Sequence, residues 1–364
     1  MEFKELPIIR FFSGSAKNEN LLPINNTGNL TPKLKGTRQY KFDLGIEELD
    51  VAILRAMAEN YPDRVLLMNA YKGHGDLHVK SQIKTAVFEA ISEDWYIFDQ
   101  DYQRREDLEK LLSKLWFIDL NRLYIETEFY GHSLVYFWML QNGEINKTKL
   151  FPRSHVEPKN GDIIPDLNDL QKRVNYRDNP LFDSVFIEMG DHEDLGILED
   201  VVRNAIIKTY GLKDWARSSE KWGDPHVVLK SASQDEDEND KKEEWLRNFA
   251  HNGYVMADID DEIELLERKG TGSHSIFKEL IELMNSENSK GINGQVATAD
   301  EKSFVGSAEV HERILNKYTK ARLFQLMYFH SETTFPFLAQ LNGGNNAYRE
   351  LDGMRFVPKI LLKK

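Results

Sequence analysis

The feature that most constrains how this chain can fold is a long amphipathic stripe in its second half. Apolar side chains recur every three or four residues between Asp194 and Trp222, and acidic residues stand at the start. The pattern ends at Trp222-Gly223-Asp224-Pro225, where glycine favours the end of a helix and proline prevents its continuation. At ~1.5 Å per residue, the stripe predicts a helix about 40 Å long. Its apolar members are Leu195, Leu198, Val202, Ala205, Ile206, Tyr210 and Trp215.

The sequence before this helix alternates between helical and strand-like patterns. Asp76 is placed to cap a helix, because its side chain can accept hydrogen bonds from the first free N–H groups. The aromatic run 95–98 is typical of a strand. The predicted helices cover residues 46–57, 77–90, 108–116 and 119–129.

A hairpin is predicted in the middle of the chain. Two apolar runs, 134–140 and 145–151, flank Asn142-Gly143, and both of these turn residues tolerate positive φ. Short strands are expected at 161–166, 171–177 and 184–188. We therefore expect an α+β fold.

After the long helix, the pattern changes several times. Strands are predicted at 226–230, 254–259 and 262–267, with a short helix around Trp245 and an acidic run at 235–240. Ser273 is expected to cap a second amphipathic helix, and Ser307 a third that extends to Phe335. The segment 286–306 between them is polar and punctuated by glycine, and at this length a loop is usually functional.

Composition excludes several classes of function. The 364 residues suggest two or three structural units, and their net charge of −13 argues against a protein whose whole surface grips nucleic acid. The absence of cysteine excludes disulfides, thiolate metal sites and cysteine nucleophiles. No phosphate-binding loop, hydrolase or zinc-protease motif occurs, so we expect no enzyme, no cofactor and no metal. The most apolar window, 115–140, carries four charges, so we expect no membrane span.

Three stretches give the chain a resemblance to bacteriophage portal proteins of the Mu type. The first is 76–87, ahead of the aromatic strand, and the second is 125–134, which leads into the hairpin. The third is the most specific and follows Gly196-Ile197-Leu198 on the long helix. It comprises Lys213, Asp214, Trp215, Glu220, Trp222, Gly223 and Pro225. The later sequence 293–298, followed by Gly306-Ser307, is similar to the family's Gly-Gln-x-x-Thr loop.

The resemblance implies an architecture for the whole chain. It would comprise an N-terminal arm and helix (1–72), a wing (73–193), a stem helix (194–222), a small α/β clip (223–272), a second stem helix (273–290), a tunnel loop (291–306), and a long helix and tail on the side of the wing and crown (307–364). Portal proteins form rings, usually of twelve subunits, at one vertex of the capsid. Double-stranded DNA passes through the ring during packaging and ejection.

The resemblance also implies sites and partners. The tunnel loop would present Gln295, Thr298, Lys302 or Phe304 to the channel, and the acidic clip residues Asp235, Glu236, Asp237 and Glu238 would offer a partner surface. The expected partners are further copies of the chain, DNA bound without sequence preference, the terminase, the head–tail connector, and a capsid or scaffold protein. The expected location is the virion, after assembly in the host cytoplasm.

Two other interpretations stay open from the residues. A capsid or tail-connector component would form a ring of different order without a tunnel loop. A magnesium-dependent enzyme acting on nucleic acid would use Asp258, Asp260 and Asp261, although these residues are also typical of a charged hairpin turn.

Overall fold

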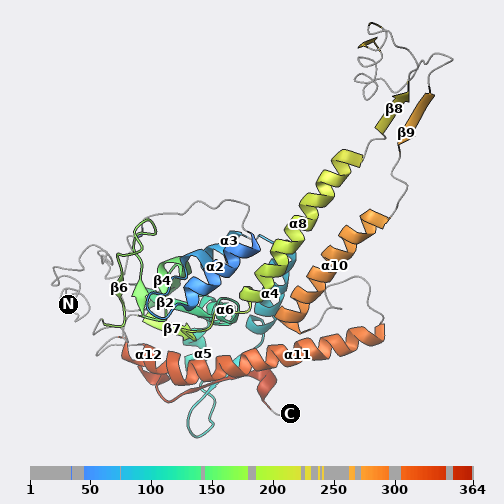
Figure 1. The fold of residues 1–364 in the computed structure, drawn as a ribbon. Coiled ribbons are helices and arrows are strands. Elements are labelled where there is room, and N and C mark those ends of the chain that lie inside the picture. The colour runs from blue at the N-terminus through green and yellow to red at the C-terminus, as the bar shows by residue number, and fades with distance from the viewer. Residues whose placement is uncertain are drawn as a thin grey trace. The chain divides into compact units, whose positions relative to one another are not determined.

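The computed structural model describes residues 34, 45–73, 75–140, 144–178, 186–222, 226–230, 237, 240–241, 262–266, 272–294, 305–341 and 347–362. The chain divides into two compact units. The first comprises Met1–Ile206 and Asn285–Lys364, and the second comprises Ile207–Met284. The division falls inside two long helices, each of which therefore contributes residues to both units (Figure 1).

The first half of the first unit is mainly helical. The helical pattern at 46–57 and the cap at Asp76 are confirmed, because the Asp76 carboxylate accepts hydrogen bonds from the backbone of His78 and Val79 at 2.8 and 3.1 Å. The predicted helix 108–116 is wrong at its end, because the helix stops before Ser113-Lys114, where the backbone of Lys114 is extended. The helices are α2 (Ile46–Met57), α3 (Val65–Gly73), α4 (Leu77–Ile91), α5 (Glu106–Leu112) and α6 (Leu115–Tyr130).

A three-stranded antiparallel sheet with the order β3-β2-β7 packs against α6. Its strands are β2 (His132–Met139), β3 (Ile145–Leu150) and β7 (Phe186–Gly190). Val135 at its centre is paired with Leu150 on one side and with Ile187 on the other, which confirms the predicted hairpin. A second small sheet comprises β4 (Val156–Glu157), β5 (Asp162–Ile163) and β6 (Val174–Asn175).

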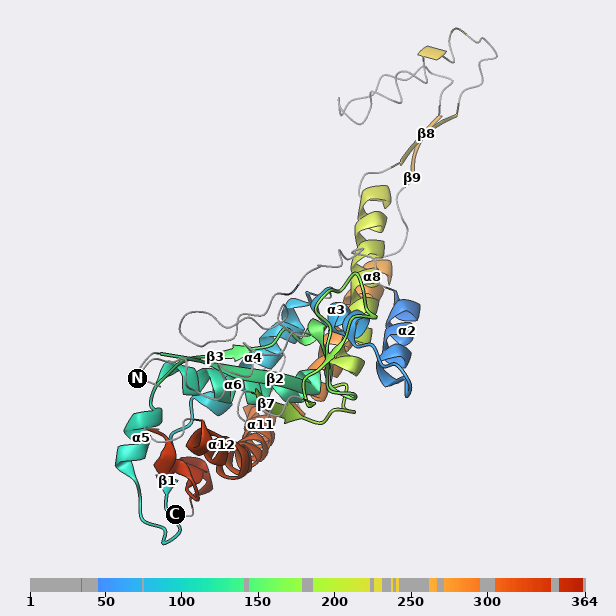
Figure 2. The same cartoon turned by 90° about the vertical axis from the view of Figure 1, so that its left-hand side faces the viewer.

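Segments far apart in sequence meet at the C-terminal side of this unit. Strand β1 (Trp95–Phe98) pairs antiparallel with β10 (Arg355–Pro358), and β10 packs against α11. Figure 2 shows β1 and α12 on the same side of this unit. Aromatic side chains fill this part of the core: Trp116 and Phe117 are buried, and Phe137 packs edge-on to Trp116 at 5.8 Å. The chain after residue 341 is thus part of the fold.

The helix α8 (Leu198–Trp222) confirms the long amphipathic stripe, although it starts four residues after Asp194. The second and third long helices are α10 (Gly272–Asn293) and α11 (Val305–Tyr328). Both begin before the serines expected to cap them, so Ser273 and Ser307 lie inside their first turns. Serine is tolerated there because the first N–H groups of a helix lack helical acceptors in any case.

Helix α11 packs across α4 and α6. Beyond its last residue, Tyr328, the chain remains helical. A π-helical segment, Phe329–Thr334, carries it into α12 (Phe335–Gln340). The extra residue in such a turn shifts the helical register, so side chains beyond it point to a new face. Here it places His330 and Phe335 in the aromatic core.

The second unit contains the later part of α8, the earlier part of α10 and one two-stranded sheet. In that sheet β8 (His226–Lys230) pairs antiparallel with β9 (Glu262–Leu266), which confirms two predicted strands. α8 is helical through Gly211, where a Cβ would meet the end of the Leu280 side chain of α10 at 2.8 Å. The predicted helix around Trp245 and strand 254–259 lie outside the described residues.

Candidate functional site at the base of the long helices

Three turns, each with a glycine at positive φ, meet at the start of α8, and we call this place the glycine crossing. Gly131 ends α6, Gly190 ends β7 and Gly196 precedes α8, and their φ angles are 79°, 84° and 79°. A Cβ atom on Gly131 would overlap the carbonyl oxygen of Asp194, and one on Gly196 would overlap that of Phe129. Because an L side chain fits neither the angle nor the space, only glycine lets these three segments approach so closely.

Hydrogen bonds fix the segment that enters α8. The Asp194 carboxylate accepts from the Gly196 N–H at 2.8 Å, and the Ile197 N–H donates to the Glu128 carbonyl of α6 at 3.3 Å. The Tyr71 hydroxyl of α3 donates to the Leu195 carbonyl at 2.9 Å. Burial raises the pKa of Tyr71, and the nearby Glu199 carboxylate adds to this rise, so the hydroxyl keeps its proton.

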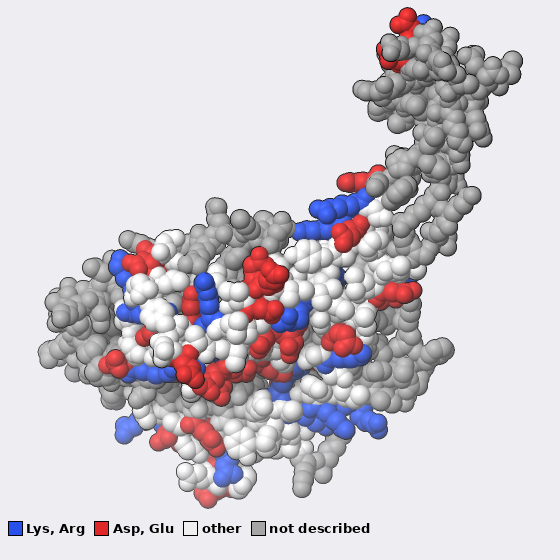
Figure 3. All heavy atoms as spheres, in the orientation of Figure 1, with Lys and Arg blue, Asp and Glu red and all other residues white. Residues whose placement is uncertain are grey.

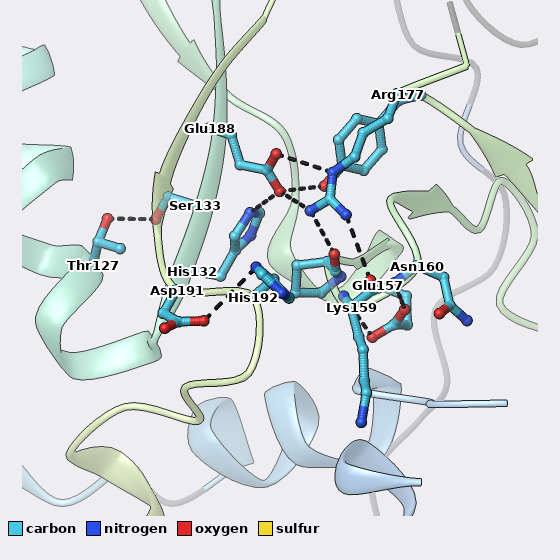
Figure 4. A network of polar contacts seen from close by, with 12 residues as sticks. Thr127, His132, Ser133, Glu157, Lys159, Asn160, Arg177, Glu188, Asp191 and His192 are labelled. Carbon is cyan, nitrogen blue, oxygen red and sulfur yellow. Dashed lines mark hydrogen bonds and ion pairs between the residues drawn. The ribbon is translucent and has the colours of Figure 1, made fainter. Parts of the chain in front are cut away.

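A polar network lies beside this crossing and joins both small sheets (Figure 4). The Glu188 carboxylate of β7 accepts hydrogen bonds from His132 Nε2 of β2 at 2.8 Å and from the Tyr176 hydroxyl at 2.7 Å. Arg177 donates to the same carboxylate from Nε at 3.2 Å and from Nη2 at 2.5 Å. The glutamate thus ties the segment after β6 to the central strand β2.

The charges in this network follow from burial and from its donors. Burial alone would raise the pKa of Glu188, but hydrogen bonds from His132, Arg177 and Tyr176 outweigh it and lower the pKa to about 2. Burial lowers the pKa of His132, which is 5% exposed. His132 is therefore a neutral imidazole that donates to the Glu188 carboxylate. The Arg177 guanidinium compensates the negative charge of Glu188.

A second part of the network runs to α6. The Ser133 hydroxyl lies 2.8 Å from both Thr127 Oγ1 and Arg153 Nη2, and the Arg153 guanidinium stacks over the Tyr130 ring at 4.0 Å. Glu157, which is fully buried, accepts from the backbone N–H groups of Lys159 and Asn160 (Figure 4). These contacts satisfy polar groups that would otherwise destabilise the interior.

The end of α10 within the first unit is fixed by polar contacts at four of its residues. Asn204 of α8 donates to Asn288 Oδ1 at 3.0 Å, and Arg322 of α11 donates to the Ile292 carbonyl at 2.8 Å. The other two contacts are His78 Nε2 with Ser289 Oγ at 2.7 Å and Asn293 Nδ2 with Gln82 Oε1 at 2.7 Å. Helices α4, α8 and α11 are thereby linked to one another through α10.

A cleft of about 300 Å³ opens between the glycine crossing and α11. The polar residues that line it include Glu128, Asp194, Arg322 and Gln325. The Arg322 guanidinium donates to the two Glu128 oxygens at 2.6 and 3.1 Å, and its Nη1 has no hydrogen-bond partner in the described chain. The Glu128–Arg322 pair in this lining joins α6 to α11.

Within the described residues we find neither a metal-binding cluster nor a membrane-spanning helix. No group of three or more histidine, aspartate or glutamate side chains within them is arranged to hold a metal ion. No helix in the same part of the chain is long and apolar enough to cross a membrane. The hydrogen bonds described above fix the first turns of α8 and the last turns of α10 to the first unit.

The site residues predicted from sequence are only partly within the described chain. Lys213, Asp214, Trp215, Glu220 and Trp222 lie on α8, where Lys213 Nζ is 5.6 Å from the Tyr210 ring. Of the acidic clip residues, Asp237 is helical and exposed. The others lie outside the described residues: Gly223, Pro225, Asp235, Glu236, Glu238, Gln295, Thr298, Lys302 and Phe304, and also Asp258, Asp260 and Asp261.

The expected boundaries of the tunnel loop are displaced by the helices. Residues 291–293 still belong to α10, and 305–306 already belong to α11, so the segment between the helices is 294–304. Sequence reasoning missed the network around Glu188 and the tie between Glu128 and Arg322. The pairs Glu188–His132 and Glu128–Arg322 are 56 and 194 positions apart in the sequence, and local spacing carries no signal for such pairs. A weak signal existed for Gly131 and Gly196, since each directly adjoins a strongly apolar run.

The fold is shared with chains in the necks of gene transfer agent particles. A chain in the neck of an empty gene transfer agent (GTA) particle, computed with C6 symmetry, matches with a TM-score of 0.56 and 11% identity. That match covers 87% of this chain and 90% of the other. A chain in the neck of the native GTA particle, computed with C12 symmetry, matches with a TM-score of 0.54 and 11% identity over 88% and 91% of the two chains.

The sequence identifies the family within this class. A family described as the portal protein of Mu bacteriophage matches residues 71–356, most of the chain. The chain belongs to this family of phage portal proteins, and the resemblance seen in its sequence motifs is confirmed. No curated protein matches it.

Proposed function

We propose that the chain forms a ring-shaped channel at the capsid vertex, through which double-stranded DNA passes during packaging and ejection. The observation that carries this proposal is the family match, which extends over both small sheets and all three long helices. In this role the chain catalyses no reaction and needs no cofactor. The ring acts in the virion after assembly in the host cytoplasm.

A ring of about twelve subunits is the proposed assembly. The related GTA necks were computed with C6 and C12 symmetry, and a closed ring requires two different faces of each subunit to bind one another. The described chain leaves large apolar side chains exposed on several helices, among them Leu54, Leu115, Ile276 and Phe324. Burial of such surfaces between neighbours would stabilise the ring.

The acidic balance of the chain suits a conduit. Every phosphate that a protein neutralises releases counterions and strengthens DNA binding, so a wall rich in Lys or Arg would hold the duplex. A ring of twelve chains would carry twelve times −13, or about −156 formal charges. Such a ring would touch DNA without retaining it.

The functional parts proposed for this ring follow the family architecture. Residues 73–193 form the wing, 194–222 and 273–290 the stem, 223–272 the clip, and 291–306 the tunnel loop, with its ends helical as described above. The tunnel loop would contact DNA through Gln295, Thr298, Lys302 or Phe304. The clip would dock the terminase and later the head–tail connector through its acidic residues, and the wing would contact the capsid or scaffold protein.

The glycine crossing and the Glu188 network have a defined purpose in this assembly. A stem helix that carries load between a packaging motor and a capsid must keep its direction. Its first turns are fixed by backbone contacts with α6 and β7 that leave no room for a side chain, which favours a stiff mount.

Light scattering and negative-stain electron microscopy of the purified protein test this function. We expect a ring of about 510 kDa, twelve times the chain mass of 42.3 kDa, with a central hole wide enough for a DNA duplex. A protein that stays monomeric over a wide range of salt and protein concentration would contradict the proposal.

A further inference from the structure

Helix α11 presents a narrow exposed stripe that no other described part of the chain covers. Its members are Arg313, Lys317, Lys320, Phe324 and Tyr328, all exposed and separated by four, three, four and four residues. At 100° per residue they occupy less than a quarter of the helix circumference. Phe324 and Tyr328 are 50% and 47% exposed, and their rings meet edge to face at 5.1 Å.

The charges on this stripe have no partner inside the described chain. Arg313, Lys317 and Lys320 form no ion pair with any carboxylate there. Lys and Arg side chains gather over α11, whereas Asp and Glu dominate the middle of the same face (Figure 3). A stripe with three unpaired cations and two exposed aromatic rings would bind a surface that is both acidic and apolar.

Helix α2 offers a surface of that kind. Its inner side buries Leu49, Ala52 and Ala56, while its outer side exposes Val51, Leu54 and Met57 at 46%, 70% and 58%. The acidic residues Glu47 and Glu48 precede these apolar side chains in the first turn. Asp50, on the same side of the helix, pairs with Arg203 of α8 at 2.6 Å. Arg55 lies at the edge of this exposed side of α2.

The two helices carry their charged and apolar residues in the same order. Glu47, Val51 and Leu54 on α2 have the same spacing as Lys317, Ala321 and Phe324 on α11. In a parallel alignment, Glu47 therefore faces Lys317 while Leu54 faces Phe324, and Met57 comes next to Tyr328. An antiparallel alignment would instead place Leu54 and Met57 near the lysines.

We propose that the exposed stripe of α11 binds the outer face of α2 in the next copy of the chain, in parallel orientation, with Leu54 opposite Phe324. This inference rests on the proposed ring function and names two of the faces that would close the ring. Because α2 and α11 are different surfaces, the contact is heterologous, so one copy can bind a neighbour on each side. In this arrangement Lys317 faces the Glu47 carboxylate of the neighbouring copy, so this cation does not serve DNA.

Cysteine cross-linking tests the contact directly, because the chain has no cysteine of its own. The double variant Leu54→Cys/Phe324→Cys, oxidised mildly at ring-forming concentration, should give a ladder of dimers, trimers and larger species on a non-reducing gel. Neither single variant should cross-link. The matched control Leu77→Cys/Phe324→Cys, whose first position is 81% exposed, should also remain uncross-linked.

A charge exchange tests the pairing of Glu47 with Lys317. Each single variant, Glu47→Lys or Lys317→Glu, should raise the protein concentration needed for ring formation by at least about tenfold, since like charges then face one another. The combination of both should restore ring formation to near the original concentration. Neither residue is buried, so thermal unfolding of the subunit should change little.

The outcomes separate this inference from the ring function. If the unmodified protein forms rings but the double-cysteine variant gives no ladder, the inference is wrong and the ring function stands. Cross-linking by the Leu54→Cys variant alone would indicate a symmetric contact between two α2 helices, and an intramolecular cross-link would indicate a contact within one chain; either contradicts the inference. Intact rings that release DNA more easily in the Lys317→Glu variant would assign the stripe to DNA instead.

Discussion

The Arg322 guanidinium binds the Glu128 carboxylate through two hydrogen bonds, 2.6 and 3.1 Å long, and so joins α11 to the last turns of α6. The two partners differ in exposure: the side chain of Arg322 is 5% exposed and that of Glu128 is 32% exposed. Removal of the glutamate would leave a buried cation without its counterion, whereas removal of the arginine would leave a carboxylate that water can reach. Substitution of the glutamate and of the arginine should therefore lower the free energy of unfolding by unequal amounts.

We expect Glu128→Ala to lower the free energy of unfolding by about 3–5 kcal/mol, and Arg322→Met by less. Urea titrations of both variants and of the double variant measure the difference. The double variant should be more stable than the sum of the single losses indicates, because no charge is then left unpaired. Equal losses that add without coupling would show that the pair contributes little to the junction.

The glycine crossing predicts a sharp contrast among substitutions. We expect Gly131→Ala and Gly196→Ala each to lower the free energy of unfolding by about 3 kcal/mol or more, because positive φ and backbone overlap act together. Thermal unfolding followed by circular dichroism measures this loss. Gly291→Ala is the control: its Cβ would meet Val201 at an ordinary 3.7 Å, inside helix α10. That control should be neutral or stabilising by up to about 1 kcal/mol.

Local pattern predicted helices that expose one polar face and missed helix α3, which does not. Helix α3 was missed because Val65, Leu67, Met68 and Ala70 are all buried and its Asn69 is buried as well. A helix surrounded by protein lacks the polar face that reveals a helical period. By contrast, α8 was predicted because only one side of its first turns is buried, so the stripe stands out in the sequence.

The candidate site was less accessible to sequence reasoning than the fold. Glu188 meets His132, Tyr176 and Arg177 only after β2, β6 and β7 are in register, and nothing in the spacing of these residues indicates a cluster. The family resemblance, in contrast, depended on local motifs along α8 and in the stretch 125–134. Short motifs identified what the protein is, while tertiary packing determined how its long helices are held.

His330 predicts a loss of stability at mildly acidic pH. Burial among aromatic rings lowers its pKa from 6.5 to about 3, and its Nε2 donates to Asn121 Oδ1 at 2.7 Å. Below pH 6.5 the unfolded chain therefore binds a proton that the folded chain does not, so stability is complete above pH 6.5 and falls as the pH decreases. Burial lowers the pKa of His132 as well, which gives the same sign. Glu188 does not contribute in this range, because its stabilising effect is lost only as the pH falls from about 4.5 towards about 2.

Between pH 7.5 and pH 5, we expect His330 to account for a loss of about 2 kcal/mol, at about 1.4 kcal/mol per pH unit below 6.5. Urea titrations at several pH values measure this slope. The His330→Gln variant retains a donor for Asn121 and does not titrate, so its slope should be smaller by that amount. An unchanged slope would mean that the histidine is protonated in the folded protein.

The close approach of α8 and α10 at Gly211 and Leu280 predicts how the second unit responds to a larger side chain. The Cβ of Gly211→Ala would meet only the flexible end of Leu280, at 2.8 Å, so a small rotation of that side chain accommodates it. We expect Gly211→Ala to change stability by less than about 1 kcal/mol, because the gain in helix propensity offsets the crowding. Gly211→Leu should force the two helices apart and destabilise their pairing by about 1–3 kcal/mol.

Hydrogen exchange of the α10 amides between Ile276 and Met284 reports this pairing locally. If contact with Leu280 is the cause, Leu280→Ala added to Gly211→Leu should recover much of the protection, because it removes the volume that the new side chain needs. No recovery would show that a leucine at position 211 acts through some other neighbour of α8.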